Sequence, residues 1–258
     1  MSKIKKISIL VASIVFVGIL SFSFYNNVNE AQDNQEEKGP ENNNSQDQTI
    51  LASKDFSSTS SLDDMVYNSD FIAVGSYESL DEIWNMAADP ENEDEYVEGH
   101  LYNFSVSEVF KGENMNSIKI NHRYSENIPV EITSGDEEIS PEGILIKEAT
   151  TTENFVVENK DPLFIEPDFS KKYIVFLKKG DTGNYYAAIE PYLIEFDENE
   201  VAVLKSNLLN LDEQDLSIVT EIDGHEIVIH NDIHQNIDDN ISGKEYSEIK
   251  ESIISLIN

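Results

Sequence analysis

Three of the chain's five histidines lie close together near the carboxyl end, among carboxylates. The run reads Asp223-Gly-His225-Glu226-Ile-Val-Ile-His230-Asn-Asp232-Ile-His234. Imidazole and carboxylate groups are the ligands that zinc and copper take in proteins. The residue types at His225, His230, Asp232 and His234 therefore suggest a divalent-metal site, in either a metal-binding protein or a metal-dependent enzyme.

The spacing of these histidines argues against a zinc-binding helix. His225-Glu226 stands one residue further from His230 than the H-E-x-x-H pattern allows, so the imidazoles would not share a helical face. On a strand, an odd separation directs His225 and His230 to opposite sides. His230 and His234 can meet only if the chain turns after Asn231. Ordinary surface histidines are the simpler interpretation, and the metal site is the alternative.

Acidic stretches at 89–98, 135–138 and 197–200 offer oxygen ligands suited to Ca²⁺. None of them has the alternating acids, central glycine and closing glutamate of an EF-hand loop. Solvated turns are the simpler interpretation of all three. We therefore expect no cofactor, with Ca²⁺ or Zn²⁺ as the only candidates.

Aromatic residues offer a second kind of site. Trp84, the only tryptophan, and the pair Tyr185-Tyr186 have side chains that stack on a sugar ring or on a partner protein. Packing within a core or an interface is the alternative for each. The nucleophile elbow G-x-S-x-G, the P-loop and the dinucleotide fingerprint do not occur in the sequence. No residue is therefore predicted to be catalytic.

The charge of the chain narrows the choice of partners. It carries 17 Lys and Arg against 51 Asp and Glu, a formal net charge of −34. Such a field repels phosphate backbones and anionic headgroups, which excludes nucleic acid and favours basic partners or cations. There are no cysteines, so disulfides, thiolate metal sites and a cysteine nucleophile are also excluded.

The amino-terminal residues have the pattern of an export signal. Lys3, Lys5 and Lys6 precede the uncharged segment 7–24, and a polar run follows at once. A helix of this length reaches about 27 Å, just enough to cross a hydrocarbon core. Residues 1–25 are therefore expected to be a signal peptide or an amino-terminal membrane anchor, with the rest of the chain outside the cell. Residues 26–60, poor in apolar side chains, are expected to form a disordered acidic and polar linker.

Residues 61–258 are expected to form one acidic, mainly β domain with a carboxyl-terminal helix. Capping-box patterns at Ser61 and at Ser242 predict a short helix and the helix 242–257. Gly75, inside the strand expected at 70–78, indicates a bulge or sharp bend. A short helix is expected around Trp84, followed by a hairpin from 100–110 and 117–123. The stretch 124–168 is expected to be irregular. Strands are expected at 171–179 and 185–196, joined by a turn, and a short strand at 226–230.

Three segments of this domain resemble a known layout. They are the runs 63–75 (DDMVYNSDFIAVG), 102–112 (YNFSVSEVFKG) and 172–177 (KYIVFL). Their order and spacing resemble those of uncharacterised bacterial exported domains, which are themselves similar to the netrin-like fold of tissue inhibitors of metalloproteinases. The resemblance covers residues 61 to about 205. It implies a five-stranded OB-like barrel with flanking short helices.

The resemblance does not carry the inhibitors' activity. In that family a free amino-terminal cysteine chelates the protease zinc, and this chain has no cysteine. We therefore expect a non-enzymatic, envelope-associated interaction domain outside the cell, whose partner is a protein or a cation-bearing surface. The alternative is the metal-dependent function centred on the histidine-rich stretch.

Overall fold

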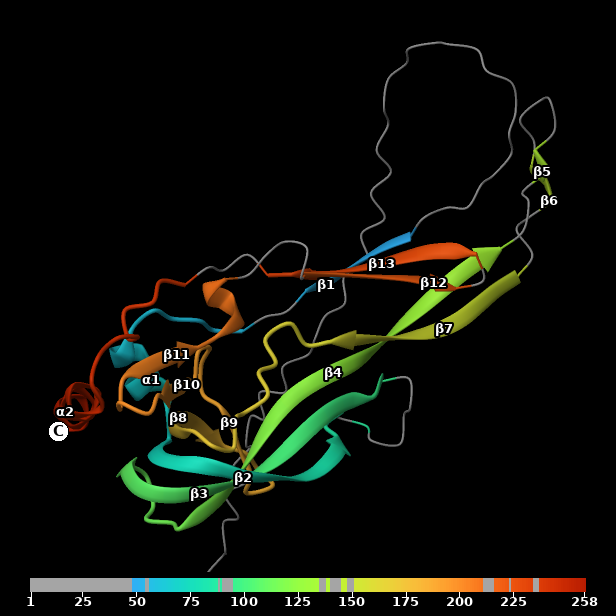
Figure 1. The fold of residues 1–258 in the computed structure, drawn as a ribbon. Coiled ribbons are helices and arrows are strands. Elements are labelled where there is room, and N and C mark those ends of the chain that lie inside the picture. Colours follow the sequence, from blue (N-terminus) through green and yellow to red (C-terminus); the bar gives the residue numbers. More distant parts are fainter. Residues whose placement is uncertain are drawn as a thin grey trace, which may run out of the picture. The chain divides into compact units, whose positions relative to one another are not determined.

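Strands make up most of the described chain, and a helix follows them at the carboxyl end (Figure 1). The structure is a computed structural model that describes residues 48–53, 56–87, 89, 95–134, 138–139, 145–147, 151–210, 216–222, 224–233 and 237–258. All of them belong to one unit, Asn44–Asn258. The hydrophobic segment 7–24 and most of the expected linker lie outside the described residues. The prediction of a mainly β protein with a carboxyl-terminal helix is confirmed.

The elements follow in chain order. They are β1 (Gln48–Ser53), α1 (Leu62–Asn68), β2 (Phe71–Asn85), β3 (Val97–Lys111), β4 (Ser117–Ser134), β5 (Glu138–Ile139), β6 (Leu145–Lys147), β7 (Thr151–Lys160), β8 (Lys172–Lys179), β9 (Tyr185–Ala187), β10 (Leu193–Phe196), β11 (Ala202–Lys205), η2 (Asn207–Leu209), β12 (Ser217–Ile222), β13 (His225–Asp232) and α2 (Tyr246–Ile257).

Five strands pair in a closed ring. Antiparallel pairing joins β8 to β2, β2 to β3 and β3 to β4. The short strand β9 completes the ring, because it pairs in parallel with β4 and antiparallel with β8. The expected hairpin from 100–110 and 117–123 is confirmed as the β3–β4 pair. Strands β10 and β11 extend the sheet beyond β8, and β7 extends it beyond β4.

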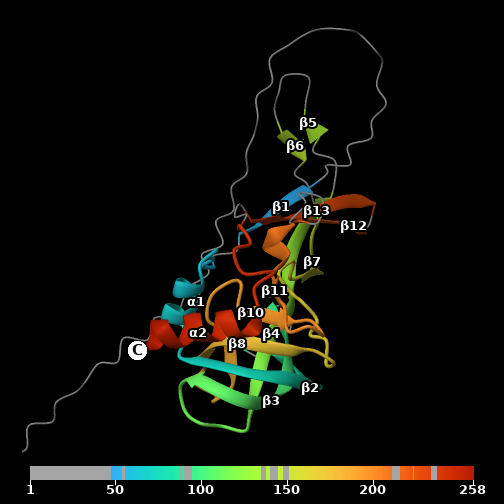
Figure 2. The same ribbon diagram turned by 60° about the vertical axis from the view of Figure 1, so that its left-hand side comes forward.

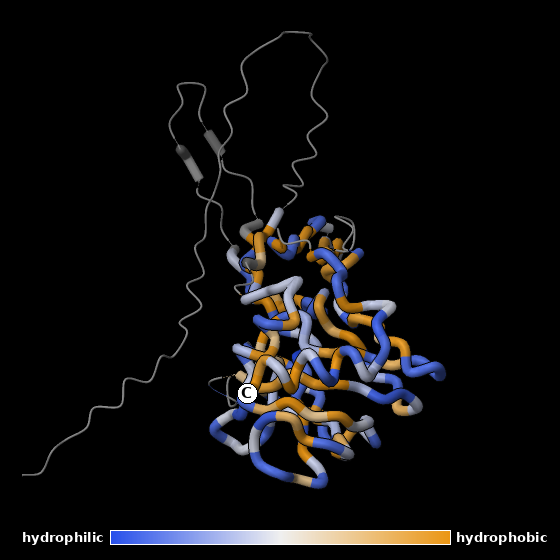
Figure 3. The backbone as a smooth tube through the Cα atoms, turned by 90° about the vertical axis from the view of Figure 1, so that its left-hand side faces the viewer, coloured by the Kyte–Doolittle hydropathy of each residue, from blue (hydrophilic) through white to orange (hydrophobic). Residues whose placement is uncertain are grey.

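Alternation along these strands separates two cores. Phe71, Ala73 and Tyr77 of β2 pack with Tyr173 and other inward residues of the ring. The residues between them, such as Ile72 and Val74, pack on the other side with α1, α2, β10 and β11. Because successive strand residues point to opposite faces, one apolar run serves both cores. Figure 3 shows hydrophobic stretches of chain in the interior of the folded part and hydrophilic residues in many loops at its periphery.

A second sheet packs against the far part of β4. It has the order β1-β13-β12, with β1 parallel to β13 and β12 antiparallel to it. Ile227 and Ile229 of β13 meet Ile128, Val130 and other apolar residues of β4 and β7 in a core of their own. Figures 1 and 2 show this sheet beside the ends of β4 and β7.

Several local predictions were wrong. Trp84 lies in β2 and pairs with Gly99 rather than forming a helix. The stretch expected to be irregular contains the outer half of β4 and all of β7, with Pro129 opposite Val156. Beyond the end of β3, β4 pairs only with β7, and a proline is tolerated on such an edge. Residues 48–53 of the expected linker form β1, so the folded part begins before residue 61.

The predictions for Gly75 and the helices are largely confirmed. The register of β2 against β3 shifts at Gly75, where an added methyl group would lie 1.9 Å from the Ser105 carbonyl oxygen. Helix α1 follows Ser61, although the Ser61 side chain makes no capping hydrogen bond. Helix α2 begins at Tyr246 rather than at 242, and Ser242 Oγ accepts instead from the Leu204 amide.

Candidate functional site

The predicted metal ligands are distributed over both faces of β13. His225 has the same parity as the buried Ile227 and Ile229, whereas His230 and Asp232 have the opposite parity. His230 Nδ1 lies 2.9 Å from Ser217 Oγ. His234 lies outside the described residues. Among the residues that the structure describes, no three His, Cys, Asp or Glu side chains come together as a metal site.

The face of the second sheet that points away from β4 is called the outer face here. It consists of Thr49 and Leu51 of β1, Ser217, Val219 and Glu221 of β12, and Glu226, Val228, His230 and Asp232 of β13. Val219 and Thr49 flank Val228, and Ser217 and Leu51 flank His230. Leu51 and Val219 are 64% and 61% exposed, so each of the two central rows of this face holds one aliphatic side chain that is open to solvent.

The aromatic candidates do not form one surface. Trp84 is half-buried, and its indole N–H donates to Asn121 Oδ1 at 2.9 Å. Tyr185 is only 4% exposed and packs on Phe71, with ring centroids 4.9 Å apart. Tyr186 alternates with it on β9 and is exposed. Of the three rings, Tyr186 is therefore the one that solvent reaches best.

The acidic turn at 197–200 is closed by hydrogen bonds from its own backbone to the Asp197 carboxylate. Asp197 Oδ1 accepts hydrogen bonds from the backbone N–H groups of Asn199 and Val201, each at 2.8 Å. The bond from Val201 is the main cause that lowers the pKa of Asp197. Its carboxylate thus closes a turn, as an Asx side chain commonly does. The stretches 89–98 and 135–138 lie largely outside the described residues.

A buried histidine at one end of the ring was not singled out by the sequence analysis. His122 continues the inward series Ile118, Ile120 on β4. Its Nε2 lies 2.9 Å from the Tyr77 hydroxyl and its Nδ1 lies 3.1 Å from the Tyr192 hydroxyl. Burial lowers the pKa of His122 to about 3, against the opposing effect of a backbone hydrogen bond with Ile165. The His122 imidazole is therefore neutral at physiological pH, and it donates through one nitrogen and accepts through the other.

The phenols around His122 are held protonated as well. Burial raises the pKa of Tyr77 and of Tyr192 far above the usual value, and it raises that of Tyr102 to about 12. Tyr77 meets Tyr102 and Tyr173 edge to face. A neutral histidine among neutral phenols neither accepts nor releases a proton readily near pH 7, so this cluster is suited to holding the end of the ring together.

A buried acid lies on the segment between β9 and β10. Glu190 is 9% exposed, and Ser206 Oγ donates to its Oε1 at 2.6 Å. Burial raises the pKa of Glu190 to about 7, Ser206 lowers it and Asp161 raises it further. The backbone of Glu190 is also fixed, because its N–H donates to Ser57 and its carbonyl accepts from Thr59. The spacing of Glu190 in the sequence gives no signal for this burial.

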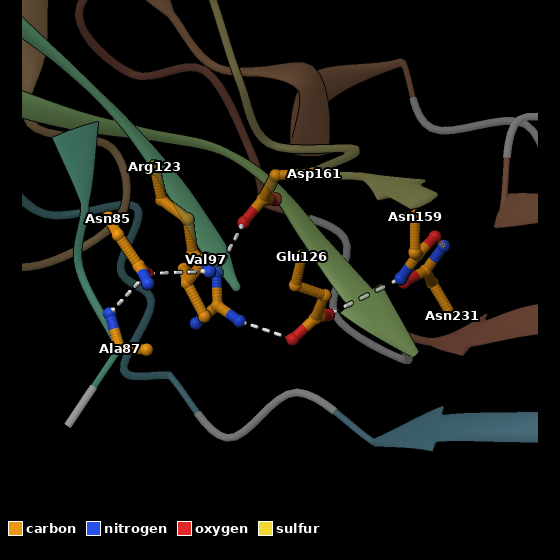
Figure 4. A network of polar contacts seen from close by, with 8 residues as sticks. All are labelled: Asn85, Ala87, Val97, Arg123, Glu126, Asn159, Asp161 and Asn231. Carbon is orange, nitrogen blue, oxygen red and sulfur yellow. Dashed lines mark hydrogen bonds and ion pairs between the residues drawn. The ribbon is translucent and has the colours of Figure 1, made fainter. Parts of the chain in front are cut away.

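A polar network crosses from the ring sheet to the second sheet (Figure 4). Arg123 pairs with Glu126, and its Nε lies 3.6 Å from Asp161 Oδ2. Glu126 Oε1 accepts from Asn159 Nδ2 at 3.3 Å. Asn159 and Asn231 exchange two hydrogen bonds, at 2.9 and 3.1 Å, and both are almost completely buried. The pair joins β7 to β13 and fixes one register between the sheets.

A shallow cavity of about 420 Å³ lies between the two helices. Val66 and Tyr67 of α1, Leu256 and Ile257 of α2 and the charged Asp63, Asp64 and Lys111 line it. Lys111 Nζ donates to the Val66 carbonyl at 2.9 Å. The one base at this cavity is thus bound to the last turn of α1, where a cation complements the helix dipole.

Comparisons with protein-family models, with curated proteins and with solved structures give no match. Within the described part of the chain, neither helix has the length and apolar character to span a membrane.

Proposed function

We propose that the chain is a non-enzymatic binding domain, exposed outside the cell, whose partner carries positive charge. The segment 7–24 directs export and either remains as an anchor or is removed. The net charge of −34 supports a cationic partner, because one-to-one pairing with all 17 bases would leave most of the 51 acids unneutralised.

We also propose that the five-stranded ring is an OB-like barrel. In chain order its strands are β2, β3, β4, β8 and β9, and the ring closes through a parallel contact between the third and the fifth. This connectivity supports the small Greek-key barrel that the resemblance to netrin-like domains implies. A barrel of this kind serves many unrelated functions, so the fold does not by itself identify the partner.

One observation carries the non-enzymatic part of the proposal. Burial shifts the pKa values of His122 and Glu190 far from their usual range, and both side chains are enclosed. Their hydrogen-bond partners are side chains of the same interior. A catalytic acid or base needs a substrate atom within hydrogen-bond reach, and these two groups face the protein instead.

Protease treatment of intact cells that express the full chain tests the location. External protease is expected to degrade the 48–258 region, whereas a variant that lacks residues 1–24 is protected until the cells are lysed. Chemical cross-linking on the same cells is expected to give adducts that decrease as salt rises, since salt screens exposed charges. Protection of the unmodified chain in intact cells would refute the proposal.

A further inference from the structure

The two faces of the second sheet differ in how far their side chains are exposed. The opposite face carries Ala52, Ile227 and Ile229, all buried against β4 and β7. On the outer face Leu51 and Val219 each leave more than half of their surface exposed. Val228 of β13 lies directly opposite Val219 of β12 and two register positions from the partner of Leu51 in β1, so each of the three strands contributes one aliphatic side chain to this face. Exposed aliphatic side chains that adjoin one another are characteristic of interaction sites.

Two acidic groups stand side by side at the hairpin end of this face. Glu221 and Glu226 are directly opposite each other at the hairpin end, and like charges in that position destabilise a strand pair. Asp232 lies at the other end of β13, about 20 Å away at about 3.3 Å per residue. The three strands contain no Lys or Arg. A cation placed across the two glutamates would relieve their repulsion.

We propose that the outer face is a docking surface for a segment of a partner protein in which aliphatic side chains alternate with or adjoin Lys and Arg. This inference rests on the proposed binding function and names the surface and the partner chemistry. The aliphatic side chains cover Leu51, Val219 and Val228, and the bases meet Glu221 and Glu226. An anionic membrane is disfavoured at this face, because its headgroups carry the same sign of charge as the acids.

The length of the outer face along β13, from Glu226 to Asp232, gives the length of the ligand. An extended segment spans about 20 Å with six residues. A suitable probe is a synthetic peptide of alternating valine and threonine, six residues long, between two pairs of lysines. Two control peptides replace the valines by serine or the lysines by glutamate. Binding of fluorescent peptide to the full-length chain in non-ionic detergent is followed by anisotropy.

Two pairs of variants separate the apolar and the charged contributions. Leu51→Ser with Val219→Ser is expected to weaken binding at least about tenfold, equivalent to about 1.4 kcal/mol. Glu221→Gln with Glu226→Gln is expected to weaken binding severalfold at low salt and to reduce its salt dependence. All four side chains are at the surface of the sheet, so these changes leave the core intact.

Strand β2 offers matched controls. Leu80 and Ile83, 41% and 52% exposed, provide the same kind of apolar surface beside Glu78 and Glu82. Leu80→Ser with Ile83→Ser, and Glu78→Gln with Glu82→Gln, are expected to leave peptide binding unchanged.

The outcomes distinguish the docking surface from the proposed function. Loss of binding in the outer-face variants alone supports the inference. If all variants bind the peptide equally, or if the β2 controls lose as much binding as the outer-face variants, the outer face is not the docking site. Neither result contradicts the proposal that the partner is cationic. Equal binding of the serine-containing peptide overturns the apolar contact. Failure to prefer the lysine peptide over its glutamate form contradicts both the inference and the cationic partner.

Discussion

The buried carboxyl of Glu190 makes the stability of the protein depend on pH in a way that one substitution removes. Its pKa is raised from 4.5 to about 7, chiefly by burial. The folded state therefore holds this proton more tightly than the unfolded chain. The resulting stabilisation is complete below pH 4.5 and is lost as pH rises to about 7. Each pKa unit corresponds to about 1.4 kcal/mol, so the loss amounts to about 3 kcal/mol.

Glu190→Gln eliminates this titration and keeps an oxygen that accepts from Ser206. The variant and the unmodified chain are expected to differ little at pH 4.5. At pH 8 the variant is expected to be more stable by about 2 to 3 kcal/mol, the lower figure allowing for a weaker hydrogen bond once the acceptor is uncharged. Urea unfolding of the full-length chain across this pH range measures the difference directly.

Glu131→Gln is the matched control, because it makes the same change of charge at an exposed position on β4. All other titrating groups are shared by the proteins compared, so they cancel in the difference between the two curves. If the curves for Glu190→Gln and the unmodified chain run parallel from pH 4.5 to 8, the reasoning about Glu190 is refuted.

Three further substitutions test other parts of the structure. Gly75→Ala is expected to lower the free energy of unfolding by about 3 kcal/mol, because the added methyl group clashes with Ser105. The control Gly183→Ala meets no atom within 4 Å and is expected to cost only about 1 kcal/mol, because of its φ of +87°. Similar losses for the two variants in urea unfolding would contradict the clash. Asn231→Ala leaves the buried Asn159 amide without its partner and is expected to cost about 2 to 3 kcal/mol, and full additivity with Asn159→Ala would exclude the pairing. The unmodified chain is expected to lose stability on acidification from pH 6.5 towards 3, because the unfolded His122 binds a proton that the folded one does not, and His122→Gln is expected to lack this loss. An equal loss of stability in the variant and the unmodified chain would show that His122 takes up a proton as readily in the folded state as in the unfolded state.

The strands of the ring could be predicted because their side chains alternate. Apolar residues alternate with polar ones in 102–107, the run 173–177 is apolar on both faces of a strand, and Gly75 marks a bend that only glycine allows. His122 also stands at an inward position of a correctly predicted strand. Its parity with Ile118 and Ile120 was the available signal for its burial.

Of the second sheet only the strand at 226–230, which is part of β13, could be predicted from the sequence. Its strand β1 comes from a polar stretch with only Ile50 and Ala52 directed to the core, so composition favours a linker. The Asp223-Gly224 dipeptide was the available signal for the β12–β13 hairpin. The contact between Asn159 and Asn231 joins residues far apart in the chain, and neither position differs in local pattern from a surface asparagine. Tertiary pairing, not propensity, determines these elements.

His122 and Glu190 titrate in opposite senses, and the overlap of their ranges has a measurable consequence. Between pH 4.5 and 6.5 the unfolded chain holds a proton on His122 that the folded protein lacks, while the folded protein holds one on Glu190 that the unfolded chain lacks. Their contributions to the pH dependence of stability therefore cancel in this range. The difference between the double variant His122→Gln, Glu190→Gln and the unmodified chain is expected to be constant there. Relative to the unmodified chain, His122→Gln is expected to lose about 1.4 kcal/mol of stability for each pH unit as pH rises through this range. Glu190→Gln is expected to gain about the same amount for each pH unit. Single variants that both slope in the same direction would show that the two groups do not titrate independently.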